Sequence, residues 1–313
     1  MLRYLLRRLA AFVPVALGVA TLTFALIHLV PGDPAVAMLG DVAGPADIVN
    51  LRHDLGLDRP IAEQYASFLW DLAHGDLGQS ISMRTPVARL IAERFPATLE
   101  LTAAGLLVAI AIAFPLGLVA GARPGGAADL SAMTFAILGI SVPHLCLGPL
   151  LMIVFSLELG WLPLTGRGGL AHLALPAITL GTGLAAILAR MMRQSLIAVR
   201  SADYIRTARA KGLSAFAALI RHGLRNALTP VITLLGLEAG ALLTGAIVTE
   251  MIFSWPGMGR LMIGAINARD YPLVEGCVLT FALAYVAANM LTDLAYGMAD
   301  PRIRLTRNRG RGE

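Results

Sequence analysis

Long uncharged stretches alternate along the chain with shorter polar ones. Six stretches hold about 20 apolar residues each, the length of helix that crosses a bilayer core of about 30 Å. They cover 9–30, 101–122, 130–157, 171–189, 227–249 and 276–299. We predict a helix over each, because lipid cannot satisfy exposed backbone groups. The first run is too long for a cleaved secretory signal, so we predict that it is retained as a span.

Composition agrees with an all-α membrane protein. Hydrophobic residues make up 57% of the chain and charged residues only 14%, against about 25% charged residues in soluble domains. The net charge is +5, but the basic residues lie beside the apolar spans. Membrane topology therefore explains them, and we expect no nucleic-acid partner.

The distribution of basic residues predicts the orientation of the six transmembrane helices. The N-terminal start, the segment 190–226 and the C-terminal tail carry most of the arginines. Basic loops stay on the cytoplasmic side, so the N- and C-termini are both predicted to be cytoplasmic. The segment 31–96 is acidic and would be periplasmic. Within it, Ile61, Tyr65, Phe68, Leu69 and Leu72 share one face at helical spacing, which predicts a short surface helix.

The segment "SADYIRTARAKGLSAFAALIRHGLRNA" is basic and water-soluble between two apolar spans. Ser201 or Asp203 can cap a first short helix, Gly212 can end it, and Ser214 can cap a second. The predicted order is helix, glycine break, helix. Two interpretations stay open: the charges hold the loop inside against anionic lipid, or the first helix docks into a groove on a partner protein.

Two acidic residues lie inside predicted spans. Glu238 falls in the fifth span and Asp293 in the sixth. An acid within a membrane suggests a functional site, so both are candidates to line a pathway. Alternatively, they face the helix bundle and pair with polar groups, which we favour for Asp293. Glu250 is expected at the membrane edge. The histidines and cysteines lack metal-ligand spacing.

The basic segment resembles the cytoplasmic loop of binding-protein-dependent ABC transporter permeases, in the branch that imports dipeptides, oligopeptides or nickel. Further motifs of that branch occur along the chain in the family's order: "PGDPA", "FPATLEL", "WLP", "FSWPGMGRL", "RDYP" and "DPRIR". The resemblance implies the MetI-like fold of type I ABC importer permeases. It also implies that the first short helix is a coupling helix that contacts an ATPase. The residues carried over are Asp203, Tyr204, Ile205, Arg206, Thr207, Ala208, Arg209, Lys211 and Gly212.

The same resemblance implies the partners and the location. They are two ABC ATPase subunits, a second homologous permease and a periplasmic or lipid-anchored solute-binding protein, at the bacterial inner membrane. The chain has no glycine-rich phosphate loop with a lysine, so we expect it not to be an enzyme. ATP and Mg would bind to the ATPase partners, and this chain would bind no cofactor. Short peptides are the expected substrate, with nickel or a metal chelate as the alternative.

Two other classes of function compete with this interpretation. A proton-coupled secondary transporter could use Glu238 and Asp293, but the paired interrupted spans of such folds are not evident. An intramembrane enzyme would need a motif such as HExxH or GxSxG, and the sequence contains neither.

Overall fold

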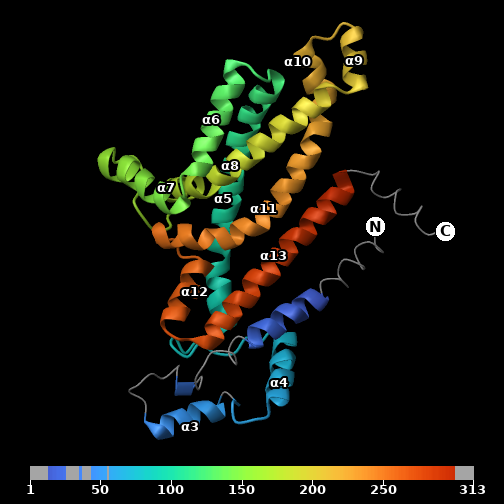
Figure 1. The fold of residues 1–313 in the computed structure, drawn as a ribbon. Coiled ribbons are helices and arrows are strands. Elements are labelled where there is room, and N and C mark those ends of the chain that lie inside the picture. Colours follow the sequence, from blue (N-terminus) through green and yellow to red (C-terminus); the bar gives the residue numbers. More distant parts are fainter. Residues whose placement is uncertain (1–12, 26–34, 37–43, 55, 300–313) are drawn as a thin grey trace, which may run out of the picture. The chain divides into compact units, whose positions relative to one another are not determined.

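The computed structural model describes residues 13–25, 35–36, 44–54 and 56–299, and this part of the chain is helical (Figure 1). Its only β-type pairing is an isolated bridge between Gln79 and Pro86. The chain forms two compact units: Met1–Ala97 with Pro256–Val286, and Thr98–Trp255 with Ala287–Glu313.

Within the described residues, four helical stretches are long and apolar enough to cross a membrane: Val87–Ala122, Leu170–Arg200, Ala215–Ile252 and Tyr271–Thr292. They coincide with the second, fourth, fifth and sixth predicted spans. The first predicted span, 9–30, lies partly outside the described residues, where only Val13–Ala25 is a described apolar helix.

The third predicted span, 130–157, is not one helix. It is divided into α6 (Ala127–Ser141), α7 (His144–Leu151) and a π-helical turn, η1 (Met152–Glu158). The break falls at Val142, which is extended (φ −91°, ψ 111°). The next residue, Pro143, has no N–H to donate and disfavours a helical conformation in the residue before it. The residues on both sides of this break are apolar, so the hydrophobic pattern predicted one continuous helix.

The first unit contains the short helices α3 (Pro45–Asp54), α4 (Ile61–Ala73) and α12 (Met258–Asn267). The predicted helix over 61–72 is confirmed by α4. Its inner side packs on the first apolar helix, where the Phe24 ring lies 5.2 Å from Tyr65 and 5.6 Å from Phe68. The Tyr65 hydroxyl also shares a 2.6 Å hydrogen bond with Thr21.

A buried carboxylate secures the start of α13 (Tyr271–Ala299) in this unit. Asp270 Oδ2 accepts hydrogen bonds from Ser80 Oγ at 2.5 Å and from Ser82 Oγ at 2.6 Å. The Ser82 amide donates to the same oxygen at 3.0 Å. Burial raises the pKa of Asp270, but these hydrogen bonds outweigh it and leave the pKa below its ordinary value. The chain near residue 80 is thus tied to the last span.

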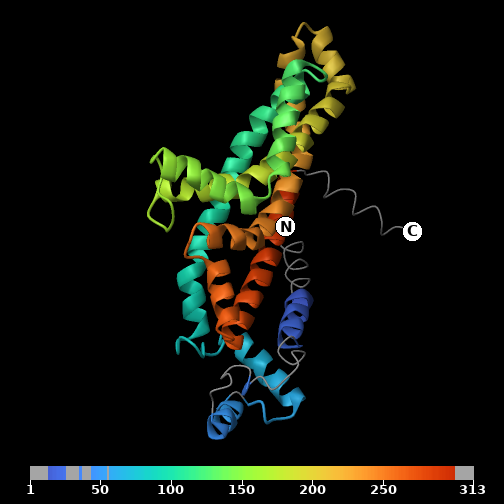
Figure 2. The same cartoon turned by 60° about the vertical axis from the view of Figure 1, so that its left-hand side comes forward.

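The second unit is built around α8 (Leu170–Arg200), which packs against α6, α7 and α11 (Leu224–Ile252) (Figures 1 and 2). α8 also lies close to α5 (Val87–Ala122), because the two helices meet at glycines such as Gly117 and Gly181. Small residues at helix crossings allow such close approach in membranes.

An ion pair joins α8 to α6 beyond the predicted end of the fourth span. Arg193 donates to both carboxylate oxygens of Asp129, at 2.5 and 2.7 Å. Asp129 is 3% exposed and also accepts from the Gly125 amide at 2.8 Å. The pair is bidentate, and α8 continues to Arg200, eleven residues beyond the predicted limit of the span at 189.

Candidate functional site

A helical hairpin between α8 and α11 forms the first half of the candidate site. α9 (Asp203–Ala210) is followed by Gly212 in the left-handed region, with φ +94°, and then by α10 (Ala215–Ala218). The Ser214 hydroxyl caps α10 by accepting from the Ala217 amide at 3.2 Å. The predicted order of helix, glycine break and helix is confirmed. The cap of α9 differs, because Ala202 holds that position without a side-chain bond.

The apolar side of α9 is buried within the chain itself. Ile205 is 2% exposed and Ala208 is 8% exposed, and both pack against Ala218. Val199 and Leu213 complete this cluster. The small side chain of Ala208 therefore keeps α9 close to α10, and it does not lie on the outer face of the hairpin.

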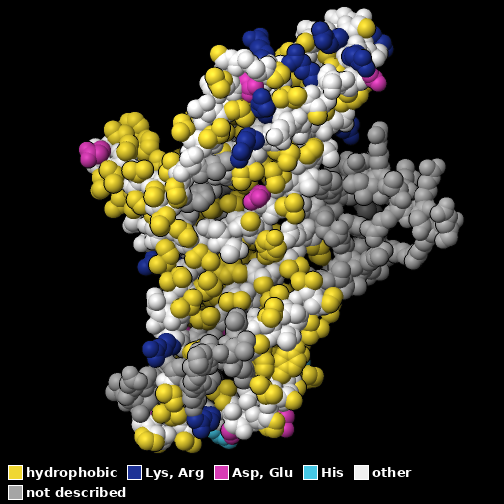
Figure 3. Space-filling model, viewed as in Figure 1, with side chains coloured by type: hydrophobic (Ala, Val, Ile, Leu, Met, Phe, Trp, Pro, Cys, Tyr) yellow, Lys and Arg dark blue, Asp and Glu magenta, His cyan; other side chains and the backbone are white. Residues whose placement is uncertain are grey.

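The outer face of the hairpin is basic and polar. It consists of Asp203, Tyr204, Arg206, Thr207, Arg209, Lys211 and Gly212. Asp203 and Arg206 form an ion pair one turn apart. Figure 3 shows Lys and Arg side chains gathered at the end of the second unit that carries α9 and α10. We call this surface, with Phe216 added, the hairpin face.

Sequence reasoning missed Phe216, which is 59% exposed at the start of α10. A helix of four residues is too short to show apolar periodicity, so the hydrophobic pattern could not predict that Phe216 is exposed. Tyr204 is 41% exposed on α9. Exposed aromatic rings beside basic side chains are typical of protein interfaces, so the hairpin face has the chemistry of a docking surface.

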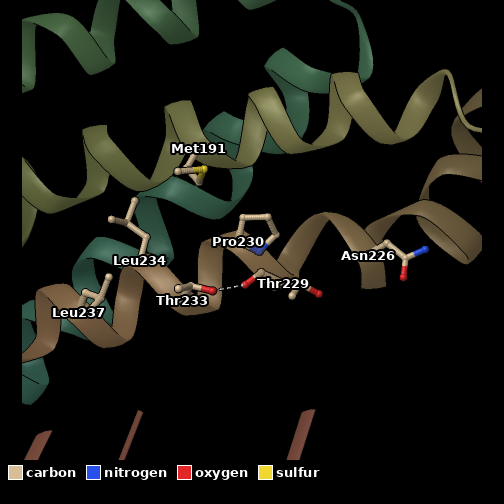
Figure 4. A pocket seen from close by; sticks show the side chains of 7 residues that line it. All are labelled: Met191, Asn226, Thr229, Pro230, Thr233, Leu234 and Leu237. Atoms are coloured by element: carbon tan, nitrogen blue, oxygen red, sulfur yellow. Dashed lines mark hydrogen bonds between the residues drawn. The ribbon is translucent and has the colours of Figure 1, made fainter. Parts of the chain in front are cut away.

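A cavity of about 560 Å³ between α8 and α11 forms the second half of the candidate site (Figure 4). Met191 of α8 lines it, together with Asn226, Thr229, Pro230, Thr233, Leu234 and Leu237 of α11. From Asn226 to Leu237 an α-helix rises about 16 Å. The cavity thus follows one face of α11 from its hairpin end into the apolar span.

Among the described residues, the lining of this cavity is neutral, because its polar groups are one amide and two threonine hydroxyls. Thr233 Oγ1 donates to the Thr229 carbonyl at 2.9 Å. Glu238 follows Leu237 directly but is not among the lining residues. It is half-buried and forms no hydrogen bond or ion pair with another described residue. The side chain of Asp293 lies outside what the structure describes.

Glu250, which the sequence places at the membrane edge, has a fully buried side chain, a burial that the sequence did not predict. Thr98 Oγ1 donates to Glu250 Oε1 at 2.5 Å, and Thr98 is fully buried as well. Because a buried carboxylate must be hydrogen-bonded, the contact fixes the C-terminal end of α11 to α5. The sequence pattern does not indicate this burial, because the burial depends on the pairing of two residues far apart in the chain.

The chain belongs to the family of binding-protein-dependent transport system inner membrane components. The model of that family matches residues 113–305, and the model of its N-terminal part matches residues 1–102. The chain is thus a transport component of the inner membrane, and this confirms the resemblance stated from its motifs.

Among individual relatives, the glutathione transport system permease protein GsiC of Pectobacterium atrosepticum is 44% identical over 304 residues. The dipeptide transport system permease protein DppB of Escherichia coli is 41% identical over 336 residues. Each alignment covers 97% of this chain and 99% of the relative.

Solved structures share the fold at low identity. The MetNI methionine ABC transporter in an inward-facing conformation matches with a TM-score of 0.53 and 15% identity, covering 67% of this chain and 96% of that one. An amino acid ABC transporter matches with a TM-score of 0.51 and 16% identity, covering 68% and 94%. These likenesses confirm a helical fold of the type I importer permease class.

Proposed function

We propose that this chain is a permease subunit of an ATP-driven importer that moves short peptides across the inner membrane. Relatives named for glutathione and dipeptide transport support peptides as the substrate class. The mechanism is supported by one observation: two features lie at the same end of α11. The hairpin face is exposed there, and the neutral cavity begins at Asn226, immediately behind it.

ATP hydrolysis belongs in this proposal to two separate ABC ATPase subunits, which also bind the ATP and Mg. They dock on the hairpin face, where Tyr204, Phe216 and the exposed basic side chains meet them. Ile205 and Ala208, on the buried side of α9, hold that helix against α10. Nucleotide-driven movement of the ATPases then biases the permease between inward-open and outward-open states.

The neutral cavity suits peptides of varied sequence. Asn226, Thr229 and Thr233 offer hydrogen-bonding groups that match a peptide backbone, and none of the described residues that line the cavity is charged. Recognition would then favour the peptide bond over any one side chain. Glu238, at the edge of this face, ranks second as a pathway residue, and Asp293 remains a candidate on sequence grounds alone.

The remaining assignments follow the sequence and the family. Six spans with both termini in the cytoplasm would place the hairpin inside and the acidic segment 31–96 outside. A solute-binding protein, periplasmic or lipid-anchored, would deliver the peptide to that outer side. A second, homologous permease would complete the pore.

Uptake in cells tests the substrate. Cells lacking this chain should lose uptake of a labelled dipeptide or of glutathione and regain it when the chain is restored. Loss of nickel uptake alone, with peptide uptake intact, would contradict the proposal.

Charge reversal tests the docking surface. Arg209→Glu, on the exposed side of α9, should sharply reduce the ATPase that co-purifies with the tagged permease. Arg94→Glu is the matched control, because Arg94 is also exposed but lies in the other unit. Equal recovery of ATPase with both variants would show that the hairpin face is not the docking surface.

A further inference from the structure

One residue joins the two halves of the candidate site. Asn226 lines the cavity, and its Nδ2 donates a hydrogen bond to Tyr204 Oη at 3.0 Å. The two residues are 22 positions apart, one on α11 and the other on α9. The bond thus joins the hairpin face to the wall of the cavity.

The helix that carries Asn226 is continuous from the hairpin into the membrane. α10, the π-helical turn η2 (Leu219–Gly223) and α11 form one helical stretch, Ala215–Ile252, of 38 residues. A π-helical turn keeps the helix unbroken while shifting its faces, and such turns are frequent at functional sites. Movement of α10 is therefore passed directly to α11.

α9 is linked to α8 on one side and packs against α10 on the other, so it could move with either helix. A two-residue link, Ser201 and Ala202, connects it to α8. On the other side, Ile205 and Ala208 pack on Ala218 of α10. Apolar packing of this kind is not directional. The Tyr204–Asn226 hydrogen bond is directional, and it fixes the register of α9 against the α10–α11 rod.

We propose that Asn226 is a positioning residue that makes α9 move with α11 through Tyr204. Displacement of the hairpin face then shifts the cavity-lining side of α11 relative to Met191 on α8. Without the bond, α9 slips on α10, and part of each displacement is lost before it reaches the cavity. The inference rests on the proposed function for its driving force, but the bond and its mechanical effect are properties of this chain alone.

The first test measures coupling in the complete transporter, purified through a tag on this chain and reconstituted in lipid vesicles. The readout is labelled dipeptide taken up per ATP hydrolysed. Tyr204→Phe removes only the hydroxyl, and Asn226→Leu removes the amide at similar volume. Each should lower the ratio about fivefold, a size typical of weak coupling between sites. The double variant should fall no further, because both changes break the same bond.

Two variants separate coupling from general damage. Asn226→Asp keeps an acceptor for the Tyr204 hydroxyl and should restore most of the ratio. Tyr285→Phe removes the hydroxyl of another tyrosine that is 41% exposed, and it should leave the ratio unchanged. An unchanged ratio in Tyr204→Phe, or losses that multiply in the double variant, would overturn the proposal.

The second test does not depend on the ATPase. Hydrogen exchange of the α9 backbone amides in the purified permease should speed up severalfold in Tyr204→Phe and not in Tyr285→Phe. Equal exchange in both would overturn the proposal, even with a fully active transporter. Absence of ATP-driven uptake in the wild-type vesicles would instead count against the proposed function, and the exchange result would still decide the role of Asn226.

Discussion

The close crossing of α5 and α8 depends on the absence of a side chain at Gly181. A Cβ at this position would lie 2.5 Å from the Gly105 carbonyl oxygen and 3.1 Å from the Ala109 amide nitrogen. Carbon–oxygen contacts in proteins usually begin near 3.3 Å, so the overlap is roughly 0.8 Å. Both neighbours are backbone atoms that cannot rotate away. Gly181→Ala must therefore push the helices apart, and overpacking of this kind costs about 1–3 kcal/mol.

A second glycine supplies the matched control. Gly245 lies within α11 and has no atom within 4 Å of the position that a Cβ would take. Alanine in place of helical glycine gains up to about 1 kcal/mol of helix propensity, and both variants share that gain. The difference between them isolates the cost of the clash.

Thermal unfolding in detergent measures this difference. Gly181→Ala should melt about 2–6 °C below Gly245→Ala, taking roughly 2 °C per kcal/mol for a chain of this size. Equal midpoints would mean that α5 and α8 are not in backbone contact at Gly181, and the packing of the second unit would need revision.

Three further perturbations follow from the structure. The depressed pKa of Asp270 means that its carboxylate stabilises the folded chain above the ordinary aspartate pKa of about 4. This contribution is lost as pH falls through the lower native value, so thermal midpoints should drop in acid for wild type and less for Asp270→Asn. Asp129→Asn leaves Arg193, which is partly exposed, without its bidentate partner and should cost about 1–3 kcal/mol in a denaturant titration, whereas a wild-type midpoint would show the pair to be dispensable. Gly212→Ala forces a side chain into the left-handed region at φ +94°, so α9 should shift, at a cost of about 1–2 kcal/mol, and co-purified ATPase should decrease; full recovery would show that the break tolerates a Cβ.

Much of the hairpin could be predicted because its signals are local. Gly212 and Ser214 specify the turn and the cap within a few residues, and the structure confirms both. The buried side of α9 could not be predicted, because an eight-residue helix with basic residues on several faces has no single apolar stripe. The choice of Ile205 and Ala208 depends on Ala218, which comes after the turn.

Features that depend on distant residues escaped the sequence. In the sequence, Asn226 is an ordinary polar residue at the start of a span. Its hydrogen bond to Tyr204 is evident only in the structure. The burial of Glu250 depends on Thr98, 152 positions away. Glu238 was singled out because it is an acid inside a span, whereas the described residues that line the neighbouring cavity are neutral. Its role as a pathway residue stays a prediction.

Photocrosslinking at the hairpin face tests the central claim most directly. A photoreactive side chain placed at Arg209 in living cells, with the same group at Arg94 as the control, would capture whatever contacts each position. We predict that position 209 yields a covalent adduct with a separate protein that carries a phosphate-binding loop and hydrolyses ATP, and that position 94 does not. Adducts with lipid alone at position 209, in cells actively importing peptide, would contradict the account.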